Sequence, residues 1–369
     1  MAAKPDAVAR TRAPTAATPD DTRPPDDTRQ QLDSVQALRA VAALSVLGMH
    51  IPAIEHGAFG VDLFFVTSGF IVCHVAASDP GRFLLKRAIR VVPLYWSCTL
   101  VLFALAIAAP GLMGATRADW GELVKSLAFV PFVKSNEQVH PLLYLGWTLN
   151  YEMLFYALFA LSLLIAPQRP HLPAITFLLV LFAIGRTSTL RSVPLTFWTG
   201  AVVIEFVFGI VAYRIWRSGA LRRLHPALAV MLALTALAVM SPLDLDPFSD
   251  ARPWLWGVPA WIAFLATLSL EGRWRVPAWW LLLGNASYSL YLTHAYILQA
   301  IQKKLVPMDV LSAPKLMCMA ASVLLCCAVA VACFNFFERP STLWLRRRLL
   351  RPRWRSGSVR AARDAINRA

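Results

Sequence analysis

The sequence predicts an all-α membrane protein, a polytopic helix bundle with about ten transmembrane helices. Hydrophobic residues make up 57% of the 369 positions, charged residues make up only 15%, and long apolar runs recur along most of the chain. A soluble domain of this size has about 25% charged residues. An apolar run of about 20 residues, by contrast, is long enough to cross a bilayer as a helix.

The chain begins with a polar segment, residues 1–31, that is rich in Pro, Ala, Thr, Asp and Arg. With almost no large apolar side chain it cannot bury a core, so we expect a disordered cytoplasmic tail. It also lacks the apolar core of a cleavable signal peptide, and the first apolar helix is therefore expected to direct membrane insertion. A membrane domain over 32–341 and a basic cytoplasmic tail over 342–369 are predicted to follow.

Ten apolar runs in this domain are each assigned to one spanning helix. The stretch 119–133 is apolar as well, but Lys125 and Pro131 interrupt it, so it is interpreted as interfacial or re-entrant. The expected spans are 36–54, 58–77, 91–110, 147–166, 173–187, 194–213, 227–242, 254–270, 278–300 and 316–337.

The positive charges indicate orientation in the membrane rather than nucleic-acid binding. The net charge is +15, and with the amino terminus inside, 26 of the 36 Lys and Arg residues fall in inner segments and nine in outer loops. This bias predicts that both termini are cytoplasmic. Membrane lipids, and no nucleic acid, are the expected partners of the basic segments.

The positions of the cysteines and the absence of common hydrolase and nucleotide-binding motifs exclude several other classes of protein. All six cysteines fall within predicted spans, and no CxxC or Cys/His spacing is present, so neither a disulfide framework nor a bound metal is expected. The sequence also has no GxxxxGK[ST], HExxH or GxSxG motif.

The first apolar run carries an ionisable pair, Arg39 and His50, within RAVAALSVLGMH. Eleven helical steps make about three turns, which puts both side chains on one face about 16 Å apart. Ionisable residues within a membrane helix suggest a functional site. The alternative is that Arg39 snorkels to the headgroups and His50 lies at the outer interface.

Two carboxylates fall in other predicted spans. Asp62 shares a face with Gly69 in GVDLFFVTSGFIV, and the short preceding loop places it near the outer level of His50, where it either orients the imidazole or caps its own helix. Glu152 lies one turn inside LGWTLNYEMLFYALF. Burial of its carboxylate among apolar residues suits acid–base or hydrogen-bonding work. Pairing with an arginine such as Arg39 is the competing interpretation.

The remaining candidate site residues are a pair of arginines and a polar stripe on one predicted helix. Arg87 and Arg90 are three apart in the predicted inner loop FLLKRAIRVVPLYW, a spacing suited either to clamping phosphate or to the ordinary positive-inside bias. Pro93 is expected to mark the entry to the next span.

The run GNASYSLYLTHAYIL places Ser287, Tyr291 and His294 on one face, for interhelical hydrogen bonding or for a site. Glu338 and Arg339 in FNFFERP are expected to form a surface salt bridge.

Six segments taken together resemble the acyltransferase 3 family of bacterial integral-membrane O-acyltransferases, and the opening segment is most similar to members that modify exopolysaccharides. The segments occur in the family's order over about residues 32 to 341. They are SVQALRAVAALSVLGMH, GVDLFFVTSGFIV, KRAIRVVPLYW, WTLNYEMLFY, NASYSLYLTHAYIL and FFERP.

The resemblance implies roles for these residues. It implies that His50 is the catalytic histidine and Arg39 its signature partner, that Asp62 and Glu152 are the acidic positions, and that Arg87 with Arg90 engages acyl-CoA at the cytoplasmic face. One departure concerns the second acidic position, because Asn150-Tyr151 precedes a single Glu152 where many members have Val-Glu-Glu. Trp147, Tyr291 and His294 are predicted to bind the substrate.

The sequence thus predicts an acyl-CoA-dependent O-acyltransferase of the bacterial inner membrane. The expected donor is acyl-CoA, most simply acetyl-CoA, and the expected acceptor is a hydroxyl of an exported polysaccharide or its lipid-linked precursor. Direct transfer and an acyl-His50 intermediate both remain open. Polysaccharide-assembly proteins are further candidate partners. A proton-coupled transporter using Asp62, Glu152, His50 and His294 is the alternative, and an assembly scaffold is a third class.

Overall fold

The described part of the chain is all-helical in the computed structural model, so the predicted fold class is confirmed there. An isolated bridge between Val133 and Val139 is the only β-type pairing among these residues. The predicted tails fall largely outside them. The structure describes residues 31–51, 56–76, 80–112, 116–134, 137–305 and 312–350.

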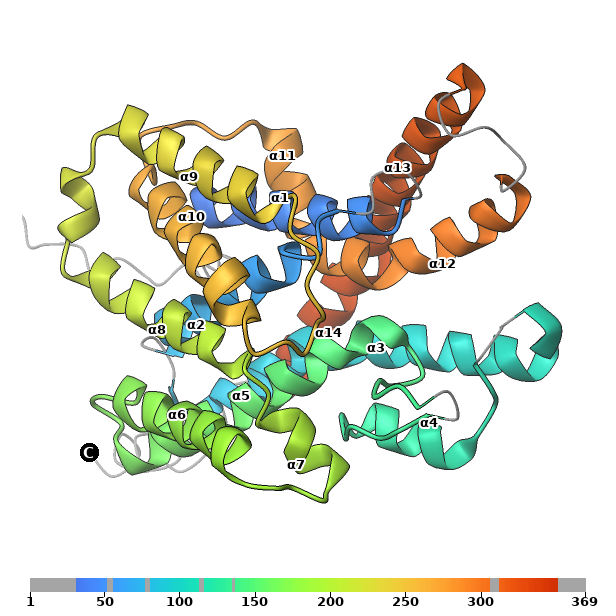
Figure 1. The fold of residues 1–369 in the computed structure, drawn as a ribbon, viewed down its shortest axis with the longest axis horizontal. Coiled ribbons are helices and arrows are strands. Elements are labelled where there is room, and N and C mark those ends of the chain that lie inside the picture. The colour runs from blue at the N-terminus through green and yellow to red at the C-terminus, as the bar shows by residue number, and fades with distance from the viewer. Residues whose placement is uncertain are drawn as a thin grey trace, which may run out of the picture. The chain divides into compact units, whose positions relative to one another are not determined.

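The helices follow one another along the described residues. They are α1 Asp33–Met49, α2 Gly60–Ala76, α3 Phe83–Ala108, α4 Trp120–Leu127, α5 Trp147–Ile165, α6 His171–Thr187, α7 Val193–Trp198, α8 Val203–Arg217, α9 Pro226–Met240, α10 Val258–Ser269, α11 Ala278–Asn285, α12 Ser287–Leu305, α13 Ala313–Cys333 and α14 Arg339–Leu349, with π-helical turns at Pro253–Gly257 and Phe334–Glu338 (Figure 1).

Four helical stretches in the described residues are long and apolar enough to cross a membrane. They are Phe83–Ala108, Tyr144–Ile165, Val193–Arg217 and Lys315–Leu349. Shorter apolar helices cover Gly60–Ala76, His171–Thr187, Pro226–Met240 and Pro253–Ser269. This composition is that of a membrane protein, while the count of about ten spans stays a prediction.

Two predicted runs contain a break in the helix. The run 278–300 is not one helix, because α11 ends at Asn285 and α12 begins at Ser287. The run 194–213 lies within the stretch Val193–Arg217, which a turn divides into α7 and α8. At this turn the Phe197 carbonyl accepts hydrogen bonds from the Gly200 amide at 3.0 Å and from the Tyr151 hydroxyl at 2.5 Å.

The inner loop predicted around Arg87 and Arg90 is helical. Helix α3 starts at Phe83 and continues through Pro93, which therefore does not mark the start of the helix. Ile89 and Leu94 are both buried on either side of the proline, so tertiary packing holds the helix together across the missing backbone donor.

The stretch predicted as interfacial or re-entrant contains the eight-residue helix α4. Asp119 caps its start by accepting a hydrogen bond from the Glu122 amide at 2.7 Å. The side chains of Tyr95 and Trp96 on α3 donate to the carbonyls of Ser126 and Leu127 at 3.1 and 3.0 Å. These bonds hold α4 against α3, and its depth in a membrane stays a prediction.

Helix α1 is fixed at its first turn by a carboxylate from a distant loop. Glu271 accepts hydrogen bonds from the Ser34 amide at 2.8 Å and from the Ser34 hydroxyl at 2.5 Å. A carboxylate satisfies the unpaired amides of a helix start and complements its dipole. So anchored, α1 packs against α2, α11 and α12 (Figure 1), and this packing brings Arg39 and His50 to the site.

Helix α2 packs closely on α8 through two glycines. A Cβ atom on Gly69 would lie 2.3 Å from the Phe206 carbonyl oxygen, and one on Gly209 would lie 2.1 Å from the Val66 oxygen. Small residues let helix backbones approach in this way in membrane proteins. The contact sets the position of Asp62, Phe64 and Ser68 on the rest of α2.

We expect Gly209→Ala to separate α2 from α8 and to destabilise the protein by about 1–3 kcal/mol, as overpacking does. The measurement is the thermal unfolding midpoint of the detergent-purified protein. Gly81→Ala is the matched control, because a Cβ there meets nothing within 4 Å. Equal midpoints for the two variants would contradict the close contact.

Candidate active site

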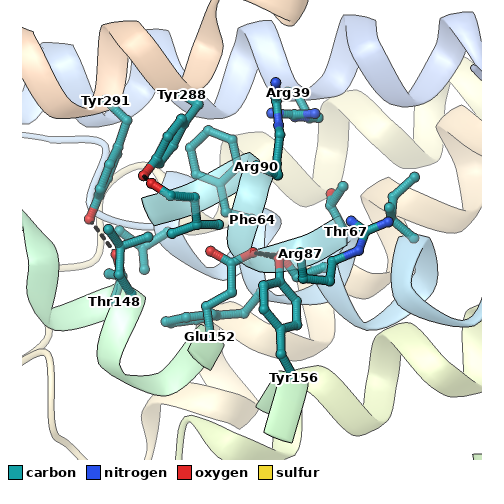
Figure 2. Close-up of a pocket in the computed structure, with 16 residues that line it drawn as sticks. Arg39, Phe64, Thr67, Arg87, Arg90, Thr148, Glu152, Tyr156, Tyr288 and Tyr291 are labelled. Carbon is teal, nitrogen blue, oxygen red and sulfur yellow. Dashed lines mark hydrogen bonds between the residues drawn. The ribbon is translucent and has the colours of Figure 1, made fainter. Parts of the chain in front are cut away.

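A cavity of about 110 Å³ with charged and apolar lining residues lies among α1, α2, α3, α5 and α12. Figure 2 shows Arg39 approaching it from one side and Glu152 with Tyr156 from the other. Five of the residues predicted for the site line this cavity: Arg39, Arg87, Arg90, Glu152 and Tyr291. The helices thus bring together side chains that are up to 252 positions apart in the sequence.

Glu152 is held by two hydroxyl groups. Ser68 on α2 donates a hydrogen bond to Oε1 of Glu152 at 3.0 Å, and Tyr156, one turn further along α5, donates to the same oxygen. Both bonds favour the carboxylate as an acceptor. The structure therefore supports an oriented carboxylate in the cavity wall, with Tyr156 as a partner that the sequence analysis missed.

Arg87 lies on the same wall as Glu152 and retains hydrogen-bonding capacity. Its guanidinium carbon is 5.9 Å from the ring centroids of Phe83 and Tyr156, within cation–π range. Its Nε is buried and has no hydrogen-bond partner among the described residues. A buried donor left without a partner is costly unless a ligand or water satisfies it.

Arg90 is instead engaged by the protein. Its Nη1 lies 2.6 Å from Oε1 of Glu338, and Ser289 donates to Oε2 of the same carboxylate at 2.5 Å. Glu338 is only 1% exposed. The predicted surface salt bridge between Glu338 and Arg339 was therefore wrong, because the π-helical turn directs Glu338 inward towards α3 and α12.

His50 and His294 form a pair at the end of α1. Nε2 of His294 lies 3.3 Å from Nδ1 of His50, and the two rings meet edge to face at 4.9 Å between centroids. The pair does not line the cavity. Tyr291 connects the histidine pair with the cavity, since it lines the cavity and its ring centroid is 6.3 Å from that of His294.

The Tyr291 hydroxyl is itself fixed on α5 and the turn before it. It donates to the Leu145 carbonyl at 3.1 Å and lies 2.9 Å from the Thr148 hydroxyl. Its ring meets that of Phe64 edge to face at 5.9 Å. Phe64 and Tyr291 are thus the side chains that both line the cavity and contact each other beside the histidine pair.

Asp62 does not have the position expected of a partner for His50. Its two carboxylate oxygens accept hydrogen bonds from Nε and Nη2 of Arg252 at 3.0 and 2.7 Å. Glu205 is 4.0 Å from the same guanidinium, and all three side chains are buried. Buried charges need such pairing, so the expected orientation of His50 by Asp62 is corrected to an ion pair with Arg252.

Trp147 belongs to the surroundings of this ion pair. It is 6% exposed, its ring centroid is 5.7 Å from the Arg252 guanidinium carbon, and it packs edge to face on Phe65 and Phe248. It does not line the cavity, so a direct contact with a substrate there stays a prediction.

Several residues of these clusters were not predicted from the sequence. Arg252 was counted among the charges of the outer loops. Glu205 is a carboxylate inside the apolar run 194–213, and this signal alone could have marked it. Tyr156, Tyr288 and Ser289 have no comparable signal, because tyrosine and serine are common in membrane helices.

Comparisons with known proteins identify the family. Residues 32–334 match a family profile described as an acyltransferase domain, Acyl_transf_3. The chain is 37% identical over 296 residues to the exopolysaccharide production protein ExoZ of Rhizobium meliloti (strain 1021), which covers 77% of this chain and 89% of that protein. No solved structure matches. The chain therefore belongs to the acyltransferase 3 family of membrane acyltransferases.

Proposed function

We propose that the protein transfers an acyl group, most simply acetyl, from acyl-CoA to a hydroxyl of an exported polysaccharide or its lipid-linked precursor. The observation that supports this most is the arginine- and tyrosine-lined cavity beside the His50–His294 pair. Membership of an acyltransferase family and similarity to an exopolysaccharide production protein favour the same class of reaction.

In this proposal Arg87 and Arg90 attract the phosphates of acyl-CoA from the cytoplasmic side. Arg87 retains a donor for them, whereas the charge of Arg90 is already balanced by Glu338. Guanidinium groups suit phosphate because they donate two parallel hydrogen bonds. Glu152 then serves as a fixed acceptor in the cavity, and Arg39 adds positive charge to the cavity that receives acyl-CoA.

His50 is the general base of the proposed reaction. Its imidazole removes the proton of the sugar hydroxyl, the oxygen attacks the thioester carbonyl, and the carbon–sulfur bond breaks to release the CoA thiolate. The proton on His50 then passes to that thiolate. Tyr291 stabilises the oxyanion during transfer, when its hydroxyl turns from the Leu145 carbonyl to the oxyanion. In the two-step variant Nε2 of His50 attacks the thioester carbonyl and the CoA thiolate leaves. The sugar hydroxyl then attacks the acyl group on His50, which frees the imidazole, and the hydroxyl proton passes to the thiolate.

The topology we propose is that of about ten spans in the bacterial cytoplasmic membrane, with both termini in the cytoplasm. Helix α1, the four shorter apolar helices and the broken pair α11 and α12 supply the spans beyond the four long stretches. The positive-inside bias sets the orientation. Membrane lipids, acyl-CoA, the carbohydrate acceptor and polysaccharide-assembly proteins are the proposed partners.

Deletion of the gene in its host tests the function. We expect the base-labile ester content of the surface polysaccharide to fall to background, and wild-type protein supplied in trans to restore it. If the esters are unchanged and the uptake or efflux of a solute is lost instead, the proposal fails and a proton-coupled transporter replaces it.

Arg87→Ala tests the donor site. Loss of a charge-assisted hydrogen bond of about 1.5–3 kcal/mol predicts a rise in KM for acetyl-CoA of about 10- to 100-fold, with a smaller change in kcat. The rate of label incorporation from [14C]acetyl-CoA in host membranes measures both. Arg87→Lys should recover only part of the affinity, because an ammonium group lacks the planar pair of donors. An unchanged KM in Arg87→Ala would contradict this role.

A further inference from the structure

The contacts of the histidine pair specify which ring nitrogens carry protons. Nδ1 of His294 lies 2.9 Å from the Leu290 carbonyl oxygen, four residues earlier on α12, and Nδ1 of His50 lies 2.9 Å from the Val46 carbonyl oxygen, four residues earlier on α1. A carbonyl oxygen only accepts, so each Nδ1 must carry the proton it donates. A neutral imidazole protonated on Nδ1 has its lone pair on Nε2.

The approach of the two rings agrees with this assignment. Nε2 of His294 is 3.3 Å from Nδ1 of His50, so a lone pair faces an N–H group. The Nδ1 proton of His50 is therefore shared between the Val46 carbonyl and His294. Two acceptors hold this one proton, and Nε2 of His50 is left as the basic nitrogen.

The surroundings of His294 fit an orienting role better than contact with a substrate. The residue is fully buried on α12, between the flanking His50 and Tyr291 rings, and it does not line the cavity. In serine hydrolases a buried acceptor on the far nitrogen of the histidine has a similar role, since it fixes the tautomer and stabilises the imidazolium.

We propose that His294 is a positioning residue that holds His50 in the Nδ1-protonated tautomer and stabilises its positive charge during transfer. The inference rests on the proposed function, in which Nε2 of His50 takes the proton of the sugar hydroxyl. When Nε2 takes this proton, both nitrogens of His50 carry protons, and the Nδ1–H group of His50 stays hydrogen-bonded to the neutral His294. After the thiolate takes the Nε2 proton, the original tautomer is restored.

Two amide variants of nearly equal size test this role. The amide of glutamine extends to about the position of Nε2 and presents an acceptor to His50, whereas that of asparagine extends only to about the position of Nδ1. Asparagine therefore keeps the contact with Leu290 and loses the contact with His50. Both variants are supplied in trans to the deletion host, and the initial rate of ester formation is measured per amount of membrane-inserted protein.

We expect His294→Gln to retain at least a third of the wild-type rate and His294→Asn to lose about 10- to 100-fold. In host membranes supplied with [14C]acetyl-CoA, the loss in His294→Asn should appear in kcat with KM for acetyl-CoA unchanged, because the residue lies outside the cavity. Similar thermal unfolding midpoints for the two variants exclude a folding effect as the cause.

Equal rates for the two amide variants, or a loss that appears only in KM, would overturn the role of His294. Restoration of esters by the wild-type protein tests the proposed function separately. If wild-type protein does not restore esters to the deletion host, the function itself fails, whatever the variants do.

Discussion

Replacing His50 with alanine is expected to reduce ester formation by at least about 10²-fold, towards the level of the deletion host. General-base catalysis contributes about 10²–10⁴-fold, and loss of a nucleophile in the two-step route would cost still more. The small side chain leaves the cavity intact, because His50 does not line it. Binding of acetyl-CoA should therefore persist, with a Kd within about threefold of the wild-type value by equilibrium dialysis.

His225→Ala is the matched control for this variant. His225 is exposed and precedes α9, outside the clusters described above, so we expect wild-type ester formation. An active His50→Ala protein would exclude His50 as base and as acyl carrier. A protein that no longer reaches the membrane would show that His50 has a structural role instead.

The second large effect is expected at Arg252. Arg252→Met leaves Asp62 and Glu205 buried without their shared cation. Removal of one partner of a buried ion pair costs about 3–5 kcal/mol. We expect little monodisperse protein after detergent extraction, and a strongly lowered Tm in what remains. Combining Arg252→Met with Asp62→Asn should recover part of the loss, because one of the uncompensated charges is removed.

The exposed pair of Arg186 and Asp250 provides the comparison. Their side chains are 31% and 69% exposed, and an exposed ion pair contributes at most about 1 kcal/mol. Arg186→Met should therefore leave the yield and Tm close to wild type. If Arg252→Met behaves in the same way, the ion pair with Asp62 does not support the packing of α2 as described.

Much of the fold could be predicted, because hydrophobicity and helical periodicity are local properties of the chain. The all-α class and most helices follow from apolar runs. The break between α11 and α12 was missed although Gly284, Asn285 and Ser287 mark it, because the long apolar runs on both sides favoured one continuous helix. The hydrogen bond from Tyr151 to the turn that divides 194–213 could not be predicted either, because Tyr151 lies on another helix.

In the site, too, features within one helix could be predicted from the sequence, whereas contacts between helices could not. The spacing of Arg39 and His50, and that of Tyr291 and His294, placed each pair on one face of its own helix, and the structure brings these two faces together. Partners across helices were less predictable. Asp62 pairs with Arg252, 190 positions away, and Arg90 pairs with Glu338, 248 positions away. No local pattern in the sequence specifies such a pairing, because it depends on how the helices pack.

The most direct test of the account is transfer of label from [14C]acetyl-CoA to polysaccharide in membranes of the deletion host that contain the protein. We predict base-labile label in the polysaccharide with wild-type protein and none with His50→Ala. Label that never enters the polysaccharide, in membranes where the wild-type protein is folded and the acceptor is present, would contradict acetyl-CoA as the donor. Equal labelling with His50→Ala would contradict the proposed chemistry at the histidine pair.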